Sequence, residues 1–200
     1  MSSTTGTNRR AGDTYYTPDD LADALTGLLN IGLDDVVWEP HAGGGAFVRA
    51  ALTWTTHVLA SDVDPAAPFM ADERCSGAKR WTEEFLSCAP ALWFRPDVII
   101  GNPPFRDFEA HVSHALRHTP RVAFLLRLAA MESKKRVEIW RRWPLSRVYV
   151  LAERPSFTGG GTDSCPYGWF IFDGAERGHA RIFPGWAPER TERLLEEVAR

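Results

Sequence analysis

The sequence contains few cysteines, no long hydrophobic run and little net charge. Its three cysteines are Cys75, Cys88 and Cys165, an odd number without the C-x-x-C spacing of metal and redox sites. We therefore expect reduced thiols, as in a cytoplasmic protein, rather than a disulfide framework. No apolar run approaches the roughly 20 residues of a membrane-spanning helix, and residues 1–10 are too polar for a signal peptide. We expect no membrane partner.

The formal net charge is −3 over 200 residues, and a content of 44% hydrophobic and 24% charged residues is ordinary for a globular domain. Residues 13–200 are predicted to form a single domain after a disordered tail, residues 1–12, which is rich in Ser, Thr, Gly and Arg. The charge is uneven, because residues 106–154 carry eleven Lys and Arg against five Asp and Glu. This basic segment is a candidate surface for an anionic polymer, although a solvated helix face would give the same composition.

Strand and helix patterns alternate along the chain. Strands are predicted over residues 35–39, 58–61, 79–81, 97–100 and 122–126, and helices over residues 17–32, 46–52, 108–116, 132–143 and 189–200. A late antiparallel pair is predicted over residues 147–151 and 169–172. In the first helix, Thr17 is the expected N-cap, Pro18 the first helical residue and Gly32 the end. The order predicts an α/β fold, a Rossmann-like doubly wound and mostly parallel sheet with an antiparallel strand near the C-terminal end.

A turn of three glycines, residues 43–45, follows the first predicted strand. The dinucleotide fingerprint G-x-G-x-x-G does not fit, because Val48 stands where its third glycine should be. Glu39 at the end of this strand would repel a pyrophosphate but would suit an ammonium group. Asp62, which ends the second strand, is placed to bind ribose hydroxyls. The charges therefore favour a cationic nucleoside without phosphate, such as S-adenosylmethionine, over NAD.

The fourth predicted strand ends at Gly101 and leads into Asn102-Pro103-Pro104-Phe105. The two prolines lack an N–H and have a fixed φ, so this turn is rigid. Open α/β sheets carry their active sites at the carboxyl ends of the strands, where this turn lies. A rigid strand-to-helix connection without a catalytic role is the simpler alternative.

Five segments of the chain together resemble the ordered motifs of a known enzyme family, and they cover residues 16–18, 39–47, 62–65, 84–86 and 102–105. The chain resembles the amino-directed DNA methyltransferases of the N6-adenine type, in a small form without an obvious target-recognition domain. The resemblance spans roughly residues 13–173. It implies a class I methyltransferase with S-adenosyl-L-methionine as cofactor and adenine in DNA as target, encoded by a bacterium or phage. A homodimer or an accessory specificity subunit would be its protein assembly.

The resemblance also implies a cofactor site, which comprises Tyr16, Thr17, Pro18, Glu39, His41, Gly43, Gly45, Asp62, Val63, Glu84, Phe85 and Asn102. Glu39 would bind the ammonium group of the cofactor, and Asp62 its ribose. Glu84 would accept a hydrogen bond from the adenine amine, with Phe85 stacked on the ring. His41 is expected to pack or hydrogen-bond beside this site rather than act as a base.

The catalytic residues implied by the resemblance are Asn102, Pro103, Pro104 and Phe105. If the Asn102 side chain and the Pro103 carbonyl each accept one N6 hydrogen, the nitrogen lone pair is directed at the methyl donor. A base in a duplex must first be flipped out of the helix. Phe105 and Phe157 would then hold it by stacking, although Phe157 could instead be a hydrophobic plug under the glycine-rich loop.

Three other functions remain open from the sequence: methylation of adenine in RNA, methylation of a protein Gln or Asn amide, and a cofactor-binding subunit that needs a partner. His111, His114 and His118 share one face of a predicted helix at i, i+3 and i+7, which resembles a metal-binding face. No Cys or carboxylate completes a ligand set, so we expect no metal.

Overall fold

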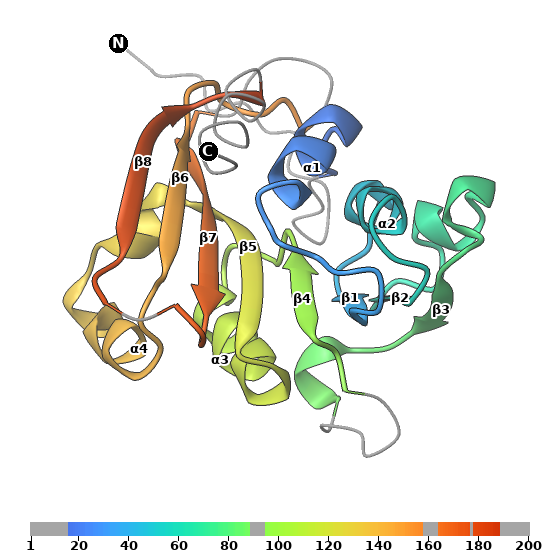
Figure 1. The fold of residues 1–200 in the computed structure, drawn as a ribbon, viewed down its shortest axis with the longest axis horizontal. Helices are drawn as coiled ribbons and strands as arrows, with labels where there is room; N and C mark the ends of the chain where they lie inside the picture. Colours follow the sequence, from blue (N-terminus) through green and yellow to red (C-terminus); the bar gives the residue numbers. More distant parts are fainter. Residues whose placement is uncertain (1–15, 89–94, 158–163, 177, 189–200) are drawn as a thin grey trace, which may run out of the picture.

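A computed structural model of the chain describes residues 16–88, 95–157, 164–176 and 178–188 (Figure 1). Its strands are β1 (Val37–Glu39), β2 (Val58–Asp62), β3 (Lys79–Thr82), β4 (Val98–Gly101), β5 (Arg121–Arg127), β6 (Arg147–Leu151), β7 (Tyr167–Asp173) and β8 (Arg181–Trp186). Its α-helices are α1 (Asp19–Thr26), α2 (Ala46–Leu52), α3 (Phe108–His118) and α4 (Val137–Arg142). The predicted tail and last helix lie outside the described residues.

The eight strands form one sheet in the order β3-β2-β1-β4-β5-β7-β6-β8. All neighbours pair in parallel except β7, which runs antiparallel to both β5 and β6. This arrangement confirms the predicted doubly wound sheet and its antiparallel strand near the C-terminal end. The order reverses between β1 and β4, and the carboxyl ends of strands at such a reversal point form the usual ligand crevice of this architecture.

Helices cover both faces of the sheet, so alternate residues of a strand enter different cores. Val37 packs in the core under α1 and α2, whereas its neighbour Trp38 packs in the core under α3. Helix α4 belongs to the α3 side, because Trp140 stacks on Phe108 of α3 and on Phe170 of β7. Burial on both faces explains why the central strands read as continuous apolar runs.

Two helix predictions were wrong in extent. Helix α1 starts at Asp19 and ends at Thr26 rather than Gly32, and Thr17 does not cap it, since the N-cap residue is Pro18 and makes no side-chain hydrogen bond. The helix predicted over residues 132–143 is split: 3-10 turns η4 (Leu128–Met131) and η5 (Lys134–Arg136) precede the short α4. Ser133 interrupts the segment with a φ of 104°.

Strand β8 was not predicted. Its residues include Pro184 and Gly185, which are poor strand formers, and it pairs only with β6 at the margin of the sheet. Proline is tolerated on such an outer strand because its missing N–H faces away from the sheet. Of the helices that the structure describes, none is long and apolar enough to span a bilayer.

Candidate functional site

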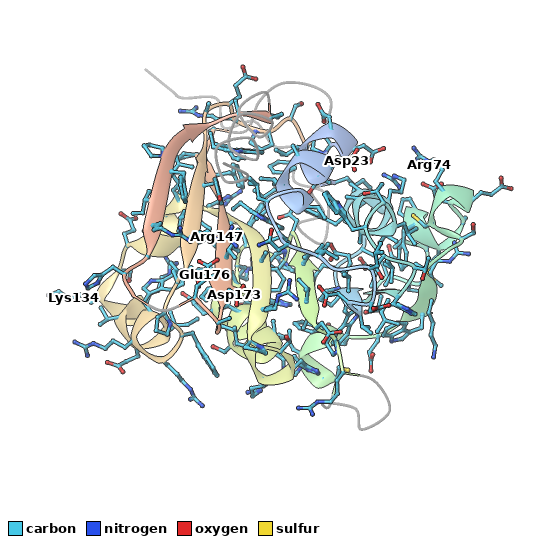
Figure 2. All side chains as sticks on the ribbon, in the orientation of Figure 1. Asp23, Arg74, Lys134, Arg147, Asp173 and Glu176 are labelled. Atoms are coloured by element: carbon cyan, nitrogen blue, oxygen red, sulfur yellow. The ribbon has the colours of Figure 1, made fainter. Side chains whose placement is uncertain are left out.

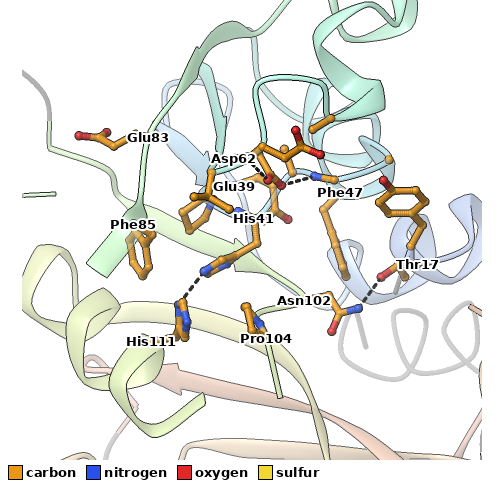
Figure 3. A pocket seen from close by; sticks show the side chains of 18 of the residues that line it. Thr17, Glu39, His41, Phe47, Asp62, Glu83, Phe85, Asn102, Pro104 and His111 are labelled. Carbon is orange, nitrogen blue, oxygen red and sulfur yellow. Dashed lines mark hydrogen bonds between the residues drawn. The ribbon is translucent and has the colours of Figure 1, made fainter. Parts of the chain in front are cut away.

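A cavity of about 440 Å³ opens at the carboxyl ends of β1, β2 and β4 (Figure 3). The predicted site residues that line it are Tyr16, Thr17, Glu39, His41, Gly43, Asp62, Val63, Glu84, Phe85, Asn102 and Pro104. Four segments therefore meet at one cavity, as expected of motifs that form one site. They precede α1 and follow β1, β2 and β4. Residues that the prediction missed also line it, among them Phe47, Glu83, Asp107 and His111.

Five predicted residues do not line the cavity: Pro18, Gly45, Pro103, Phe105 and Phe157. Gly45 has a φ of 82° and faces away from the space, because a Cβ there would lie 2.7 Å from the guanidinium of Arg49 and 2.8 Å from Cys75 Sγ. This glycine is required by packing behind the turn rather than by the passage of a ligand.

Glu39 is buried at the base of the cavity with 1% of its surface exposed. Its Oε1 accepts a hydrogen bond of 2.8 Å from the backbone N–H of His41. Burial raises the pKa of Glu39 well above its usual value despite this bond, and the nearby Asp62 carboxylate adds to the rise. A carboxylate in this position favours a cationic ligand group, because a cation would offset the cost of its charge.

Asp62 is held at the rim by two backbone N–H groups. Its Oδ2 accepts from Gly43 at 2.8 Å, and its Oδ1 accepts from Asp64 at 2.9 Å. Each oxygen is thereby fixed in direction, so the carboxylate is preorganised for a ligand. Two hydroxyls of a sugar would suit this arrangement.

The segment before α1 lies across the glycine turn. A Cβ on Gly43 would come within 3.1 Å of the Tyr16 ring, and one on Gly44 within 3.2 Å, so the ring requires the absence of side chains here. The Thr17 hydroxyl accepts a hydrogen bond of 3.3 Å from Asn102 Nδ2. Thr17 therefore orients the Asn102 amide across the cavity instead of capping a helix.

Arg49 of α2 fixes this segment. Its guanidinium forms ion pairs with Asp19, at the start of α1, and with Asp72 at 2.8 Å. It also donates to the Gly44 carbonyl at 2.9 Å. One side chain thus joins the glycine turn to the start of α1, directly after the segment that carries Tyr16 and Thr17.

Four histidines surround Phe85, which is 2% exposed. The ring centroids of His41, His111, His114 and His118 lie 4.7–6.0 Å from that of Phe85. His41 Nε2 and His111 Nδ1 are 2.8 Å apart in a hydrogen bond, as are His114 Nε2 and His118 Nε2 at 3.1 Å. The helix spacing noted in the sequence therefore packs three histidines of α3 around Phe85, and of these His111 lines the cavity together with His41 and Phe85. Among the described residues, no group of three or more side chains could hold a metal ion.

These histidines are uncharged at neutral pH. Burial lowers the pKa of His111 to about 4, and burial together with the neighbouring His114 and Arg117 lowers the pKa of His118 to about 4. Burial and the other histidines also lower the pKa of His41 well below its usual value. The cluster around Phe85 is consequently neutral, although it is made of titratable groups.

Glu84 has a structural contact in addition to its place on the cavity. Its Oε1 accepts from the Leu86 N–H at 3.2 Å and so caps the 3-10 turn η3 (Phe85–Ser87). The deep burial of Phe85 leaves little of its ring for a ligand. The expected contacts of these two residues with an adenine ring remain predictions.

Phe105 and Phe157 lie together beside the Asn-Pro-Pro turn. Their centroids are 6.4 Å apart, and Tyr167 at the start of β7 contacts both rings, at 5.4 and 5.1 Å. The guanidinium carbon of Arg127, the last residue of β5, lies 4.6 Å from the Phe105 centroid. Phe105 and Phe157 are thus neighbours, and Tyr167 and Arg127, which the sequence did not single out, join them; that the two rings hold a target base stays a prediction.

The basic segment, residues 106–154, does not form one surface. Four of its arginines are held in ion pairs: Arg121 with Asp35, Arg136 with Glu109, Arg141 with Glu138 and Arg147 with Glu176. Figure 2 labels the last of these pairs, Arg147 and Glu176. Helix α4, which carries Arg141 and Arg142, lies where β6 begins (Figure 1). This is the opposite end of the strands from the cavity. Three other arginines lie at the carboxyl ends of strands, as the cavity does. Arg127 is the last residue of β5, and Arg106 and Arg154 follow β4 and β6.

The sequence matches no family model and no curated protein. Its fold is nevertheless shared by many solved structures. A methyltransferase subunit of the type I restriction-modification system of Streptococcus thermophilus superposes with a TM-score of 0.74 at 12% identity, over 96% of this chain and 54% of that chain. A Listeria monocytogenes protein, provisionally named a class I S-adenosylmethionine-dependent methyltransferase, gives 0.71 at 13% identity, over 96% and 73%. The chain has the class I methyltransferase fold.

A third neighbour with this methyltransferase fold is an archaeal protein. It comes from Pyrococcus horikoshii, is provisionally named an RNA methyltransferase, and superposes with a TM-score of 0.67 at 17% identity, over 84% of this chain and 92% of that chain. The chain therefore spans nearly the whole of this neighbour but only about half of the type I subunit. At these identities the likeness establishes the fold, and the function has to be argued from the site.

Proposed function

We propose that this protein is a methyltransferase that uses S-adenosyl-L-methionine to methylate the N6 amine of adenine in DNA. The observation that carries the proposal is the placement of Asn102 in the same cavity as Glu39 and Asp62. An amide acceptor and two carboxylates that suit a cationic nucleoside face one space. Asn102 and Pro104 of the Asn-Pro-Pro turn line this space, and the ring of Phe105, the next residue, lies 6.4 Å from that of Phe157.

The residues present fit this cofactor. Glu39 would bind its ammonium group, and the preorganised Asp62 would bind its ribose hydroxyls. Tyr16 and Thr17 would cover its methionine portion, since they lie against the glycine turn and Asn102. When bound, S-adenosylmethionine supplies an electrophilic methyl group.

Asn102 and Pro103 prepare the acceptor nitrogen. The lone pair of an adenine N6 amine is delocalised into the ring, which makes the amine a poor nucleophile. Two oxygen acceptors on its hydrogens, Asn102 Oδ1 and the Pro103 carbonyl, would concentrate charge on nitrogen and orient its lone pair. Such preorganised polar contacts stabilise a transition state without reorganisation during the reaction.

Two features favour a nucleic-acid base over a protein amide. The aromatic rings of Phe105 and Phe157 are partly exposed next to the Asn-Pro-Pro turn and would provide flat surfaces for stacking, and the buried ring of Tyr167 packs against both. Arg106 and Arg154 are exposed at the same end of the strands, where they could contact phosphates of a flipped-out nucleotide. The type I restriction-modification subunits among the fold neighbours favour DNA and an accessory specificity subunit. The archaeal neighbour keeps RNA as the second candidate.

Transfer from labelled S-adenosylmethionine tests the proposal. The full chain is incubated with unmethylated duplex DNA, single-stranded DNA, RNA and a protein mixture, and the products are digested and identified. We expect N6-methyladenine from DNA; the same nucleoside from RNA alone, or a methylated amide, would replace DNA by the other substrates. Transfer to no substrate, with the cofactor still bound, would indicate a cofactor-binding subunit.

An Asn102→Ala variant tests the catalytic step. It should lose about a hundredfold in turnover, while its affinity for S-adenosylhomocysteine changes little. Asn30→Ala is a matched control, because Asn30 is an exposed asparagine remote from the cavity. Full activity of the Asn102→Ala variant would contradict the mechanism.

A further inference from the structure

Phe105, on the loop after β4, is contacted by two residues of neighbouring strands. Arg127 at the end of β5 and Tyr167 at the start of β7 are register partners in the sheet. Arg127 Nε donates a hydrogen bond of 3.2 Å to the Tyr167 hydroxyl. The Arg127 guanidinium lies over the Phe105 ring at 4.6 Å, within the range of a cation–π contact.

This arrangement is more rigid than a surface contact. Tyr167 is fully buried, so its hydroxyl is a fixed acceptor. The guanidinium is planar, and one bond at Nε sets the direction of the whole group. The Tyr167 ring also contacts Phe105 directly, with centroids 5.4 Å apart. Phe105 is therefore held both by a ring and by a cation from the central sheet.

A stacked adenine needs more room than the two phenylalanines leave. Aromatic carbons in contact are about 3.5 Å apart, so a base between two parallel rings separates them by about 7 Å. The Phe105 and Phe157 centroids are 6.4 Å apart and their planes are tilted by 56°. One of the two rings must turn when a base is bound.

We propose that Arg127, held by the Tyr167 hydroxyl, is a positioning residue that fixes Phe105 as the stationary stacking surface for the target base. Phe157, from the connection between β6 and β7, is then the ring that turns. Arg127 acts through Phe105 and is not required for the cofactor. This inference rests on the proposed function, because it assigns a role to the surroundings of the same target base.

The test uses Arg127→Met and Tyr167→Phe in the full chain. Methionine keeps an unbranched side chain without the cation, and phenylalanine removes only the hydroxyl. Tyr149→Phe is the matched control, because Tyr149 is also a buried tyrosine of the sheet but stacks on Phe183 of β8. The adenines that wild type methylates in an unmethylated plasmid are located by sequencing. A duplex with 2-aminopurine at one of these positions then reports base capture by its fluorescence.

We expect Arg127→Met to raise the KM for the duplex about tenfold and to weaken the 2-aminopurine signal, with unchanged affinity for S-adenosylhomocysteine. Its melting temperature should fall, because the buried Tyr167 hydroxyl loses its bond to Arg127. Tyr167→Phe should give a smaller loss of the same kind. The double variant should be no worse than Arg127→Met, because both changes remove one coupled contact. Tyr149→Phe should behave as wild type.

The possible failures are distinguishable. If Phe105→Ala abolishes base capture while Arg127→Met and Tyr167→Phe leave the KM and fluorescence unchanged, the positioning role is wrong and the proposed function stands. The same holds if the two variants lose cofactor affinity in parallel with activity, since that is a general structural effect. If wild type methylates no adenine, the proposed function fails and the inference fails with it.

Discussion

The carboxylate of Glu39 lies directly against the Cα of Gly101, so that a Cβ on Gly101 would be 2.7 Å from Oε2 and closer still to Oε1. Gly101 also has a φ of 151°, which side chains rarely adopt. The last residue of β4 therefore makes room for the buried acid at the end of β1. The glycine at this position therefore shapes the proposed cofactor site although it has no side chain.

Gly101→Ala is expected to displace the Glu39 carboxylate and to cost about 1–3 kcal/mol through backbone strain alone. The affinity for S-adenosylhomocysteine, measured by calorimetry, should fall at least about tenfold because the displaced carboxylate no longer meets the ammonium group. Gly178→Ala is the control: Gly178 has a φ of 116° with no atom near the added Cβ. Equal effects of both variants on affinity would exclude a specific role of the Gly101 contact.

Glu39→Gln separates ligand binding from stability. The amide keeps an acceptor for the His41 N–H but has no charge, so the affinity for S-adenosylhomocysteine should fall by about 1.5–3 kcal/mol. The pKa of Glu39 is higher in the fold than in the unfolded chain. Its contribution to stability is therefore complete at a pH below the pKa in the unfolded chain, and it is lost as the pH rises through the pKa in the fold. The melting temperature of Glu39→Gln should therefore exceed that of wild type by an amount that grows as pH is raised. A difference independent of pH would contradict the raised pKa.

The histidines around Phe85 predict a loss of stability in acid. The pKa values of His111 and His118 are lowered to about 4 in the fold, whereas an unfolded histidine titrates near about 6.5. Between these values the unfolded chain binds more protons, so the free energy of unfolding should fall as pH decreases from about 6.5 to 4. Urea denaturation across this range measures it.

Glu39 contributes with the opposite sign over part of this range, so the experiment is best done in the Glu39→Gln background. His111→Gln should reduce the acid dependence, because it removes one of the titrating groups. His57→Gln, at an exposed position, is the control and should leave the slope unchanged. A stability profile that is flat between pH 6.5 and 4 would show that these histidines are not held neutral.

The position of the basic residues predicts which ones contact nucleic acid. Arg106→Gln with Arg154→Gln removes two exposed cations at the carboxyl ends of the strands, and should lower the slope of log affinity against log salt by up to about 0.9 per phosphate contact. The matched pair Arg141→Gln with Arg142→Gln changes the same charge on α4, at the opposite end of the strands, and should leave the slope unchanged. The reverse result would place the nucleic acid on α4, as the composition of residues 106–154 first suggested.

The strands that carry the site could be predicted because each is a short apolar run that ends in a polar residue or a glycine. Glu39, Asp62 and Asn102 were found in this way, and the cavity brings them together. His111 and Gly101 were missed for different reasons. The spacing of His111 was noticed, but the sequence could not show that its partner is His41, 70 positions earlier. Nothing local marks Gly101 as the neighbour of Glu39.

The helix at residues 17–32 was overextended for a physical reason. Leu28 and Leu29 continue the apolar periodicity of α1, and both are buried. They lie in a turn after the helix has ended, however, and not in the helix itself. Periodicity reports burial and not hydrogen bonding. The partners of Arg127, Arg121 and Arg147 were equally hidden, because they come from elements distant in sequence.

The antiparallel direction of β7 affects how the site could change between relatives. The residues between β6 and β7 and the segments that line the cavity could change independently. In a purely parallel sheet, each strand supplies one loop at its carboxyl end, where the active site lies. The chain then returns through a helix packed on one face of the sheet. Because β7 runs antiparallel to β6, Phe157 after β6 and Tyr167 at the start of β7 both lie at the end of the sheet where β6 ends. Neither residue lines the cavity, which is lined instead by residues that follow β1, β2 and β4. The residues between β6 and β7 could thus diverge between relatives to suit new targets, while the segments proposed to hold the methyl donor stay the same.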